Sequence, residues 1–138
     1  MDIIHDEFPE ARKAIDRRIS EVLDAVKAKD FERLASYHLH STKFTKFNDI
    51  EPMGRLDIDA CNRSEQAELA AVGNVDGTVH ELKIDVFGPV AVVTGILENT
   101  FEMNGQSEDS RTRATAVFVN DGGDWKIAHE HLSTLPQS

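Results

Sequence analysis

Hydrophobic residues recur every three or four positions through the first part of the chain. From Asp6 to about Ala28 this spacing, with charged residues in the gaps, predicts an amphipathic helix of several turns. A second, short helix is expected after Asp30, whose carboxylate is suited to cap its N-terminus. Residues 41–54 read as irregular or extended chain closed by a turn, and residues 57–72 (DIDACNRSEQAELAAV) read as a third helix.

The pattern changes after Gly73. Four β-rich runs follow, TVHELKIDVF, VAVVTGILENTFEM, RTRATAVFVN and WKIAHEHLS, separated by GP, NGQSED and NDGGD. The last two separators are strong hairpin signals, so the runs predict a meander of long antiparallel strands. Three helices followed by a sheet predict one α+β domain over residues 1–138.

Both alternating faces of two of these runs, VAVVTGIL and TAVFV, are largely apolar. One face can pack on the helices, and the other then needs a cover of its own. In a single-domain protein the simplest cover is a second copy of the chain. We therefore expect a homodimer formed through the outer face of the sheet.

The composition of the chain limits the kinds of partner that it is expected to bind. The chain has 138 residues, 40% of them hydrophobic, which is enough for one core without disulfides or metals. Its net charge of -10 argues against binding nucleic acid or an anionic membrane surface. The acidic N-terminus does not read as a signal peptide. A single cysteine, Cys61, fits a reducing cytoplasm. We expect Cys61 to be a small buried residue rather than a nucleophile.

Several of these segments together resemble a known superfamily. They are the first helix, a short helix ending in LASYH, the segment KFTKF, a strand with VFGPVAVVTG and the ending DGGDWKIAHEHLS. The combination is similar to the nuclear transport factor 2-like superfamily, and within it to the SnoaL-like and ketosteroid-isomerase-like branch. The ending is also similar to that of the association domain of calcium/calmodulin-dependent kinase II.

The resemblance implies a cone-shaped, curved antiparallel sheet wrapped around three N-terminal helices, with an apolar cavity open at one end. Members of this superfamily include isomerases, cyclases, dehydratases and hydrolases, as well as non-catalytic binding or oligomerisation modules, so the fold leaves the function open. Its enzymes typically use an Asp or His to move a proton and a Tyr or a protonated acid to stabilise an oxyanion. The isomerase arrangement itself, a tyrosine on the first helix with an aspartate on the second, has no clear match here, because the only tyrosine, Tyr37, lies on the second helix.

The candidate polar groups lie in two parts of the chain. As the base we consider His129, His131, Glu130, Glu98 or Asp49, with Tyr37 or His40 as the hydrogen-bond donor. His38 and Asp85 are further polar candidates, and Phe44, Phe47 and Arg113 are candidate ligand contacts.

Strand parity divides the motif WKIAHEHLS. With a period of two, Trp125, Ile127, His129 and His131 share one face, and Glu130 lies on the other. Either face could line the cavity, and a one-residue bulge would reverse the assignment. The similarity to the kinase association domain implies that Glu130 and Glu98 look into the cone while the histidines face the dimer.

Several of these candidate residues also have a purely structural interpretation. The two histidines can be structural residues at a sheet or dimer surface, and Arg113 can pair with Glu98 or Glu130. Histidines also occur as His-x-His at 38/40 and 129/131, but no carboxylate sits at a recognised ligand spacing, so no metal site is predicted. We also predict no cofactor.

Two functions from different classes follow. The first is a small-molecule-binding cone in which cofactor-free proton transfer isomerises, dehydrates or cyclises a small, largely apolar ligand. The second is a non-catalytic module that senses a ligand or mediates oligomerisation. No residue in the sequence identifies the ligand.

Overall fold

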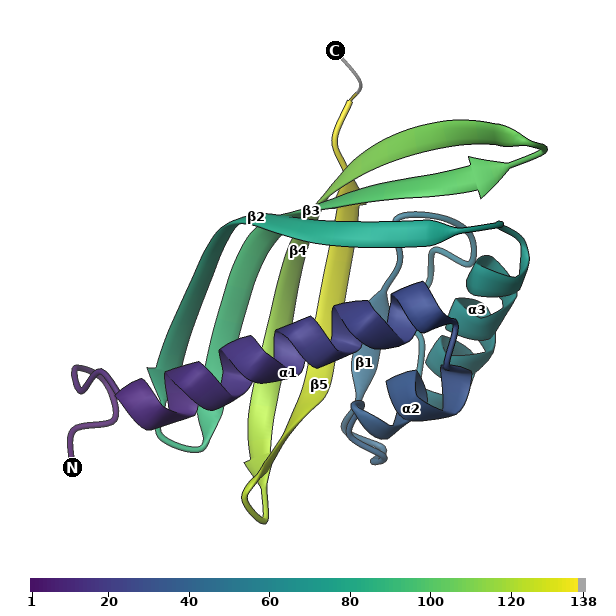
Figure 1. The fold of residues 1–138 in the computed structure, drawn as a ribbon. Helices are drawn as coiled ribbons and strands as arrows, with labels where there is room; N and C mark the ends of the chain where they lie inside the picture. The colour runs from purple at the N-terminus through teal and green to yellow at the C-terminus, as the bar shows by residue number, and fades with distance from the viewer. Residues whose placement is uncertain (137–138) are drawn as a thin grey trace.

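Three helices form the N-terminal half of the protein, whose structure, a computed structural model, describes residues 1–136. Helix α1 spans Pro9–Ala28, α2 spans Phe31–Ser36 and α3 spans Ile58–Ala70 (Figure 1). The predicted cap is confirmed: the Asp30 carboxylate accepts a hydrogen bond from the Arg33 amide at 3.1 Å. Among the described residues, no helix is long and apolar enough to cross a membrane.

Within residues 1–136, five strands form one sheet in the order β1-β5-β4-β3-β2. The four long strands, β2 (Val75–Phe87), β3 (Val90–Met103), β4 (Gln106–Asp121) and β5 (Asp124–Thr134), form the predicted antiparallel meander. The segment expected to be irregular or extended contributes a short strand, β1 (Thr45–Phe47), which pairs in parallel with β5. This edge strand links the helical layer to the strand that carries the histidines.

The sheet bends sharply, and the bend lies at a bulge in β2. His80 pairs with Ile96 and Lys83 pairs with Thr94, so two residues of β2 stand opposite Gly95 alone. A Cβ atom at Gly95 would lie 2.9 Å from Val79 Cγ1, which explains why glycine occupies this position. The part of β2 that precedes the bulge and the β3–β4 hairpin curl over the helices (Figure 1).

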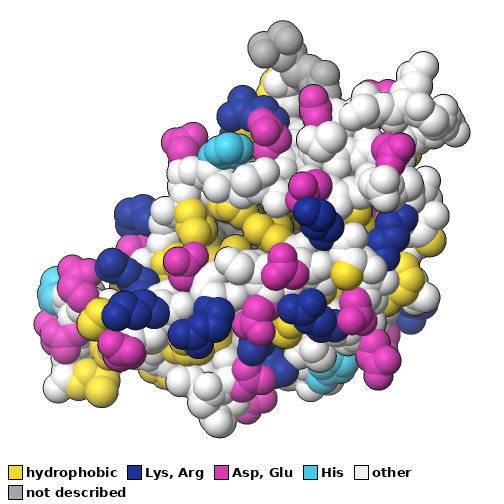
Figure 2. Space-filling model, viewed as in Figure 1, with side chains coloured by type: hydrophobic (Ala, Val, Ile, Leu, Met, Phe, Trp, Pro, Cys, Tyr) yellow, Lys and Arg dark blue, Asp and Glu magenta, His cyan; other side chains and the backbone are white. Residues whose placement is uncertain are grey.

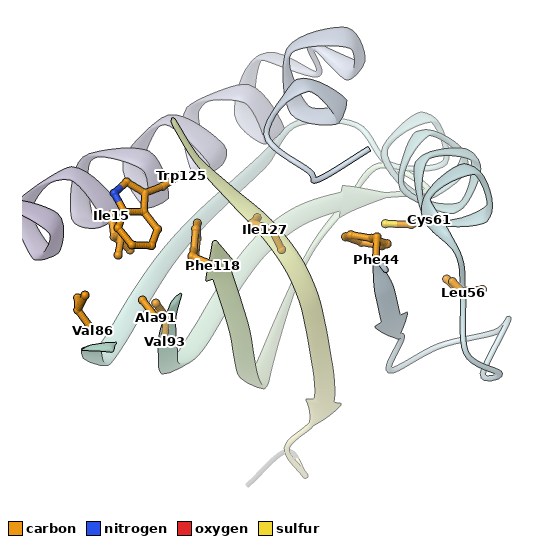
Figure 3. Packing of buried hydrophobic residues seen from close by; sticks show 10 residues of the cluster. All are labelled: Ile15, Phe44, Leu56, Cys61, Val86, Ala91, Val93, Phe118, Trp125 and Ile127. Carbon is orange, nitrogen blue, oxygen red and sulfur yellow. The ribbon is translucent and has the colours of Figure 1, made fainter. Parts of the chain in front are cut away.

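The main core fills only one part of the space under the sheet. Ile15 of α1 packs with Phe118 and Trp125, and all three are buried (Figure 3). Val86, Ala91, Val93 and Ile127 continue this cluster along the flat part of the sheet. The space under the curled part of the sheet is therefore not filled by this cluster.

Candidate functional site

A cavity of about 620 Å³ occupies the curled part of the cone. Its walls are mostly apolar and come from α1, α3 and the inner face of the sheet. Figure 2 shows hydrophobic side chains lining a hollow between α1 and the bent strands. Apolar side chains of this wall include Ile19, Leu23, Leu69, Val79, Leu97, Phe101, Ala114 and Leu132. Cavities of this size and character are typical of small-molecule sites.

A bulge in β5 decides which side chains of the last strand reach the cavity. Val117 pairs with His129 and Phe118 pairs with Ile127, which leaves Ala128 as the extra residue. The bulge shifts the alternation by one. Trp125 and Ile127 therefore face inward in the first half of the strand, and Glu130, Leu132 and Thr134 face inward in the second half.

Strand register brings Lys46 next to Glu130. The two residues are partners in the parallel β1–β5 pair, so their side chains lie on the same, inner face of the sheet. Lys46 Nζ lies 3.1 Å from Glu130 Oε1 and 3.8 Å from Glu65 Oε1. The lysine is 3% exposed, so its ammonium depends on these two carboxylates for charge compensation.

Helix α3 supplies the second acid of this cluster. Cys61, Glu65, Glu68 and Leu69 follow the spacing of one helix face, and that face is turned toward the cone. The Cys61 thiol donates a hydrogen bond to Glu65 Oε1, with 2.9 Å between sulfur and oxygen. One carboxylate oxygen of Glu65 is thus shared by several donors.

His38 closes the cluster from the end of α2. The chain leaves α2 alongside β5, where the Leu39 amide donates to the Ile127 carbonyl at 2.8 Å. This places His38 Nε2 3.0 Å from Glu65 Oε1. The imidazole is 2% exposed, and its Nδ1 has no hydrogen-bond partner among the residues that the structure describes.

The charges of this cluster shift one another's pKa. Burial disfavours the ammonium of Lys46, but the negative charges of Glu130 and Glu65 outweigh it and raise the lysine pKa. Burial likewise opposes ionisation of Glu65, yet Lys46 and the hydrogen bond from His38 lower the pKa of its carboxyl. Burial raises the pKa of the Cys61 thiol, and the nearby Glu65 charge adds to this effect. Lys46 is therefore a cation, Glu65 an anion and Cys61 a thiol.

Glu68 differs from the other acids of the cavity. Burial raises the pKa of its carboxyl, opposed by the charge of Lys46 and reinforced by that of Glu65. Within residues 1–136, no side chain forms an ion pair or hydrogen bond with Glu68. A carboxyl with a raised pKa and free oxygens, on a cavity wall, has the properties of a general acid or base.

Two of the sequence-predicted candidates for the base line the cavity. Glu130 faces inward beside Lys46, as the similarity to the kinase association domain implied. Asp49 also lines the cavity, where its carboxylate accepts hydrogen bonds from the hydroxyls of Thr134 at 2.8 Å and Thr112 at 3.4 Å. Both carboxylates are thus within reach of a bound molecule.

The other three candidates for the base lie on the outer face of the sheet. The Ala128 bulge turns His129 and His131 outward, where both rings contact Phe47 and His129 Nδ1 is 2.8 Å from Thr45 Oγ1. The expectation that Glu98 faces the cone is wrong. Its neighbours Leu97 and Asn99 face inward, and Glu98 instead pairs with His80 at 3.7 Å and with Arg111 at 3.9 Å.

The predicted ligand contacts lie outside the lining of the cavity. Tyr37 is buried in a second core cluster, where its hydroxyl accepts a hydrogen bond from Arg33 at 2.7 Å. His40 is exposed and donates to the Ala35 carbonyl. Phe44 is part of the main core and Phe47 lies on the outer face. Arg113 is exposed and donates to Ser133, so the pairing with Glu98 or Glu130 suggested by the sequence is not formed.

Three residues of the site, Lys46, Glu65 and Glu68, were not predicted from the sequence. A signal existed for the two acids, because they lie on the same helix face as Cys61 and Leu69. Lys46 carried no signal, since its inward direction depends on the pairing of a short edge strand with β5. His38 was among the polar candidates, and it does line the cavity.

The fold and the match to a family model define the class of this protein. The model of the SnoaL-like domain matches residues 15–137, so the chain belongs to the SnoaL-like family. Its solved structural neighbours include proteins named as NTF2-like. No curated protein matches the sequence.

Three solved structures illustrate the likeness. An NTF2-like protein from Streptomyces avermitilis, provisionally named a dehydratase, superposes with a TM-score of 0.83 at 18% identity over 94% of this chain and 99% of its own. A protein from Novosphingobium aromaticivorans, provisionally named a scytalone dehydratase, gives 0.77 at 15% identity over 91% and 85%. The C. elegans CaMKII association domain gives 0.73 at 22% identity over 91% and 97%. At these identities the likeness establishes the fold alone.

Proposed function

We propose that the protein binds a small, largely apolar molecule in the cone and transfers a proton on it. The observation that carries this proposal is the cavity of about 620 Å³, whose apolar walls enclose an ammonium and several carboxylates at one end. Apolar walls favour the body of such a ligand, and the polar end fixes its orientation.

Lys46 and Glu68 have complementary properties for this step. The buried ammonium of Lys46 can donate a hydrogen bond to the oxyanion that develops when a carbon next to a carbonyl loses a proton. Glu68, whose pKa is raised by burial, can accept that proton and return it. Asp49 and Glu130 are the alternative bases, and both already hold hydrogen-bond or ion-pair partners.

The proton transfer can lead to isomerisation, dehydration or cyclisation. No cofactor is required for any of them, because the enolate charge is stabilised by protein groups alone. The provisional names of the two bacterial neighbours are in keeping with dehydration.

Hydrogen–deuterium exchange tests proton transfer without knowledge of the substrate. A panel of small apolar ketones is incubated with the protein in heavy water, and exchange of the hydrogens next to the carbonyl is followed by NMR. We expect the ketones that bind to exchange faster than the uncatalysed rate. This acceleration should be lost in Glu68→Gln and retained in the exposed control Glu108→Gln. Ketones that bind without any accelerated exchange would overturn proton transfer and leave only ligand binding.

A second candidate function is non-catalytic assembly through the outer face of the sheet. Val92 and Val117 are paired on this face and are followed by the pair Thr94 and Thr115 and then by Ile96, a largely apolar surface opposite the cavity. We propose that a second copy of the chain covers it. Analytical ultracentrifugation should find a dimer for the wild type and a monomer for Val117→Glu. A monomeric wild type at tens of micromolar would contradict this arrangement.

A further inference from the structure

Three potential metal ligands converge at the charged end of the cone. His38 Nε2 lies 3.0 Å and Cys61 Sγ 2.9 Å from the same oxygen, Oε1 of Glu65, and the three ligand atoms lie within 4.8 Å of one another. We propose that His38, Cys61 and Glu65 form a binding site for a thiolate-preferring divalent metal ion, with Zn²⁺ as the expected occupant. The site does not require the proposed proton transfer, although its ligand Glu65 also lies near Lys46, at 3.8 Å.

The donor set matches the preferences of zinc. Imidazole nitrogen, thiolate sulfur and carboxylate oxygen are its usual protein ligands, and three of them leave a fourth position open. In a tetrahedral site with Zn–N and Zn–O bonds of about 2.1 Å, nitrogen and oxygen lie about 3.4 Å apart. The 3.0 Å between His38 and Glu65 therefore needs to open by only a few tenths of an ångström. Softer ligands such as Cys61 disfavour Mg²⁺ and Ca²⁺.

The charge of the cluster allows a dication to enter. With His38 protonated, the cluster holds two cations, His38 and Lys46, and two carboxylates, Glu65 and Glu130. Replacing the imidazolium proton and the Cys61 thiol proton by one Zn²⁺ leaves the net charge unchanged, because coordination deprotonates the thiol. Lys46 remains paired with Glu130 at 3.1 Å. Glu68 and Asp49, which also line the cavity, add negative charge that favours a cation.

Two further features favour an ion at this place. His38 is almost fully buried, and within residues 1–136 its Nδ1 has no hydrogen-bond partner. Nδ1 keeps an N–H both in the imidazolium and in a ring bound to a metal through Nε2, but only the imidazolium adds a buried positive charge on the ring. Glu65 also borders a second, smaller cavity of about 320 Å³ between α2 and α3, lined by Leu34, Asn62 and Gln66 among others. Glu65 thus lies between two cavities, so one ligand of the site borders the smaller cavity as well as the ligand site.

Cobalt substitution tests the site directly. The full-length protein is stripped with a chelator and titrated with Co²⁺, whose bond to a thiolate produces a charge-transfer absorption in the near ultraviolet. We expect this band at one Co²⁺ per chain, and its loss when an equimolar amount of Zn²⁺ is added. A wild-type protein that takes up no Co²⁺, or takes it up without the thiolate band, overturns the proposal.

Variants assign the ligands. Cys61→Ser should abolish the band, and Zn²⁺ affinity in Cys61→Ser and His38→Asn should fall at least about 100-fold, since even the outer partners of metal ligands are worth 10–100-fold. His129→Asn, on the outer face, is the matched histidine control and should bind Zn²⁺ as the wild type does. Circular dichroism checks that each variant folds. Unchanged Zn²⁺ affinity in folded Cys61→Ser would assign the metal to other residues and contradict the proposal.

A chelator allows the metal site and the proposed function to be tested separately. Ligand binding and ketone exchange are measured in the presence of excess EDTA, so their failure reports on the cavity chemistry alone. Failure of Co²⁺ binding reports on the His38, Cys61 and Glu65 cluster alone.

Discussion

The space between α1 and the sheet has a filled half and a hollow half, and strand β4 runs through both. In the filled half its inward residue is Phe118, which is 2% exposed and packs against Ile15 and Trp125. In the hollow half its inward residues are Ala116, Ala114 and Thr112, and they line the cavity. The inward side chains of one strand thus become smaller where the sheet curls away from the helix.

This difference shows how the protein combines stability with a cavity. Close packing of large side chains in one half stabilises the fold. The other half forgoes those contacts, and at its end the burial of Lys46 with two carboxylates replaces an apolar core. A buried charge cluster is costly to desolvate, so its presence next to a cavity indicates a use beyond stability.

The largest effect is expected in the charge cluster. Lys46→Met leaves Glu65 and Glu130 buried without their shared cation, and should lower the free energy of unfolding by about 4 kcal/mol. Urea denaturation measures this, with the exposed Lys83→Met as the control. A loss below about 1 kcal/mol would show that the lysine is not the cation holding the cluster together.

A pair of substitutions on α1 compares the two halves directly. Ile15→Ala, in the filled half, should cost about 3 kcal/mol, because it opens a void among fully buried neighbours. Leu23→Ala, on the wall of the cavity, should cost about 1 kcal/mol, because less packing is lost beside a space that already exists. Equal losses in urea denaturation would mean that the cavity is collapsed in solution.

The next effect, on the pH dependence of stability, is expected from the protonation of His38. In the metal-free protein, kept so by excess chelator, burial opposes protonation of His38, but the hydrogen bond and the charge of Glu65 raise its pKa above the ordinary value. The resulting stability is fully present below about pH 6.5, where a histidine in the unfolded chain is also protonated. It is lost as the pH rises through the higher pKa of the folded state, at no more than about 1.4 kcal/mol per pH unit. This fall should be absent in His38→Asn, and a slope unchanged by that substitution would refute the assignment.

The smallest effect is expected on the outer face. His129→Asn removes the contact with Thr45 and should change the free energy of unfolding by about 0.5–1 kcal/mol. Binding of an apolar probe in the cavity should be unchanged, as measured by fluorescence titration. A large loss of probe binding would indicate that β5 is not bulged at Ala128 in solution.

Much of the fold could be predicted from the sequence because its signals are local. The spacing of apolar residues predicted the helices, Asp30 predicted a cap, and NDGGD predicted a hairpin. The curved sheet around the helices followed from the resemblance of WKIAHEHLS and the other segments to a family. Membership of that family is supported over residues 15–137.

The site was less predictable because it depends on single-residue shifts between distant segments. The bulge at Ala128 puts Glu130 on the same face as Trp125, and no local signal in WKIAHEHLS marks it. Lys46 reaches the site only through a parallel pairing that brings β1 beside β5. His129 and His131 led to a predicted site on strand residues that lie on the outer face. Glu65 and Glu68, which reach the cavity, lie on a helix without a recognisable motif.

The central claim is that the hollow half is a binding site for an apolar molecule. Titration with the neutral fluorescent probe N-phenyl-1-naphthylamine tests it in the wild type, in Ala114→Trp, which fills the cavity, and in Ala70→Trp, which adds the same side chain on the exposed surface of α3. We expect the wild type and Ala70→Trp to bind one probe per chain equally well, and Ala114→Trp to bind it at least about tenfold more weakly, a difference of about 1.4 kcal/mol. Equal binding by a folded Ala114→Trp would contradict the account.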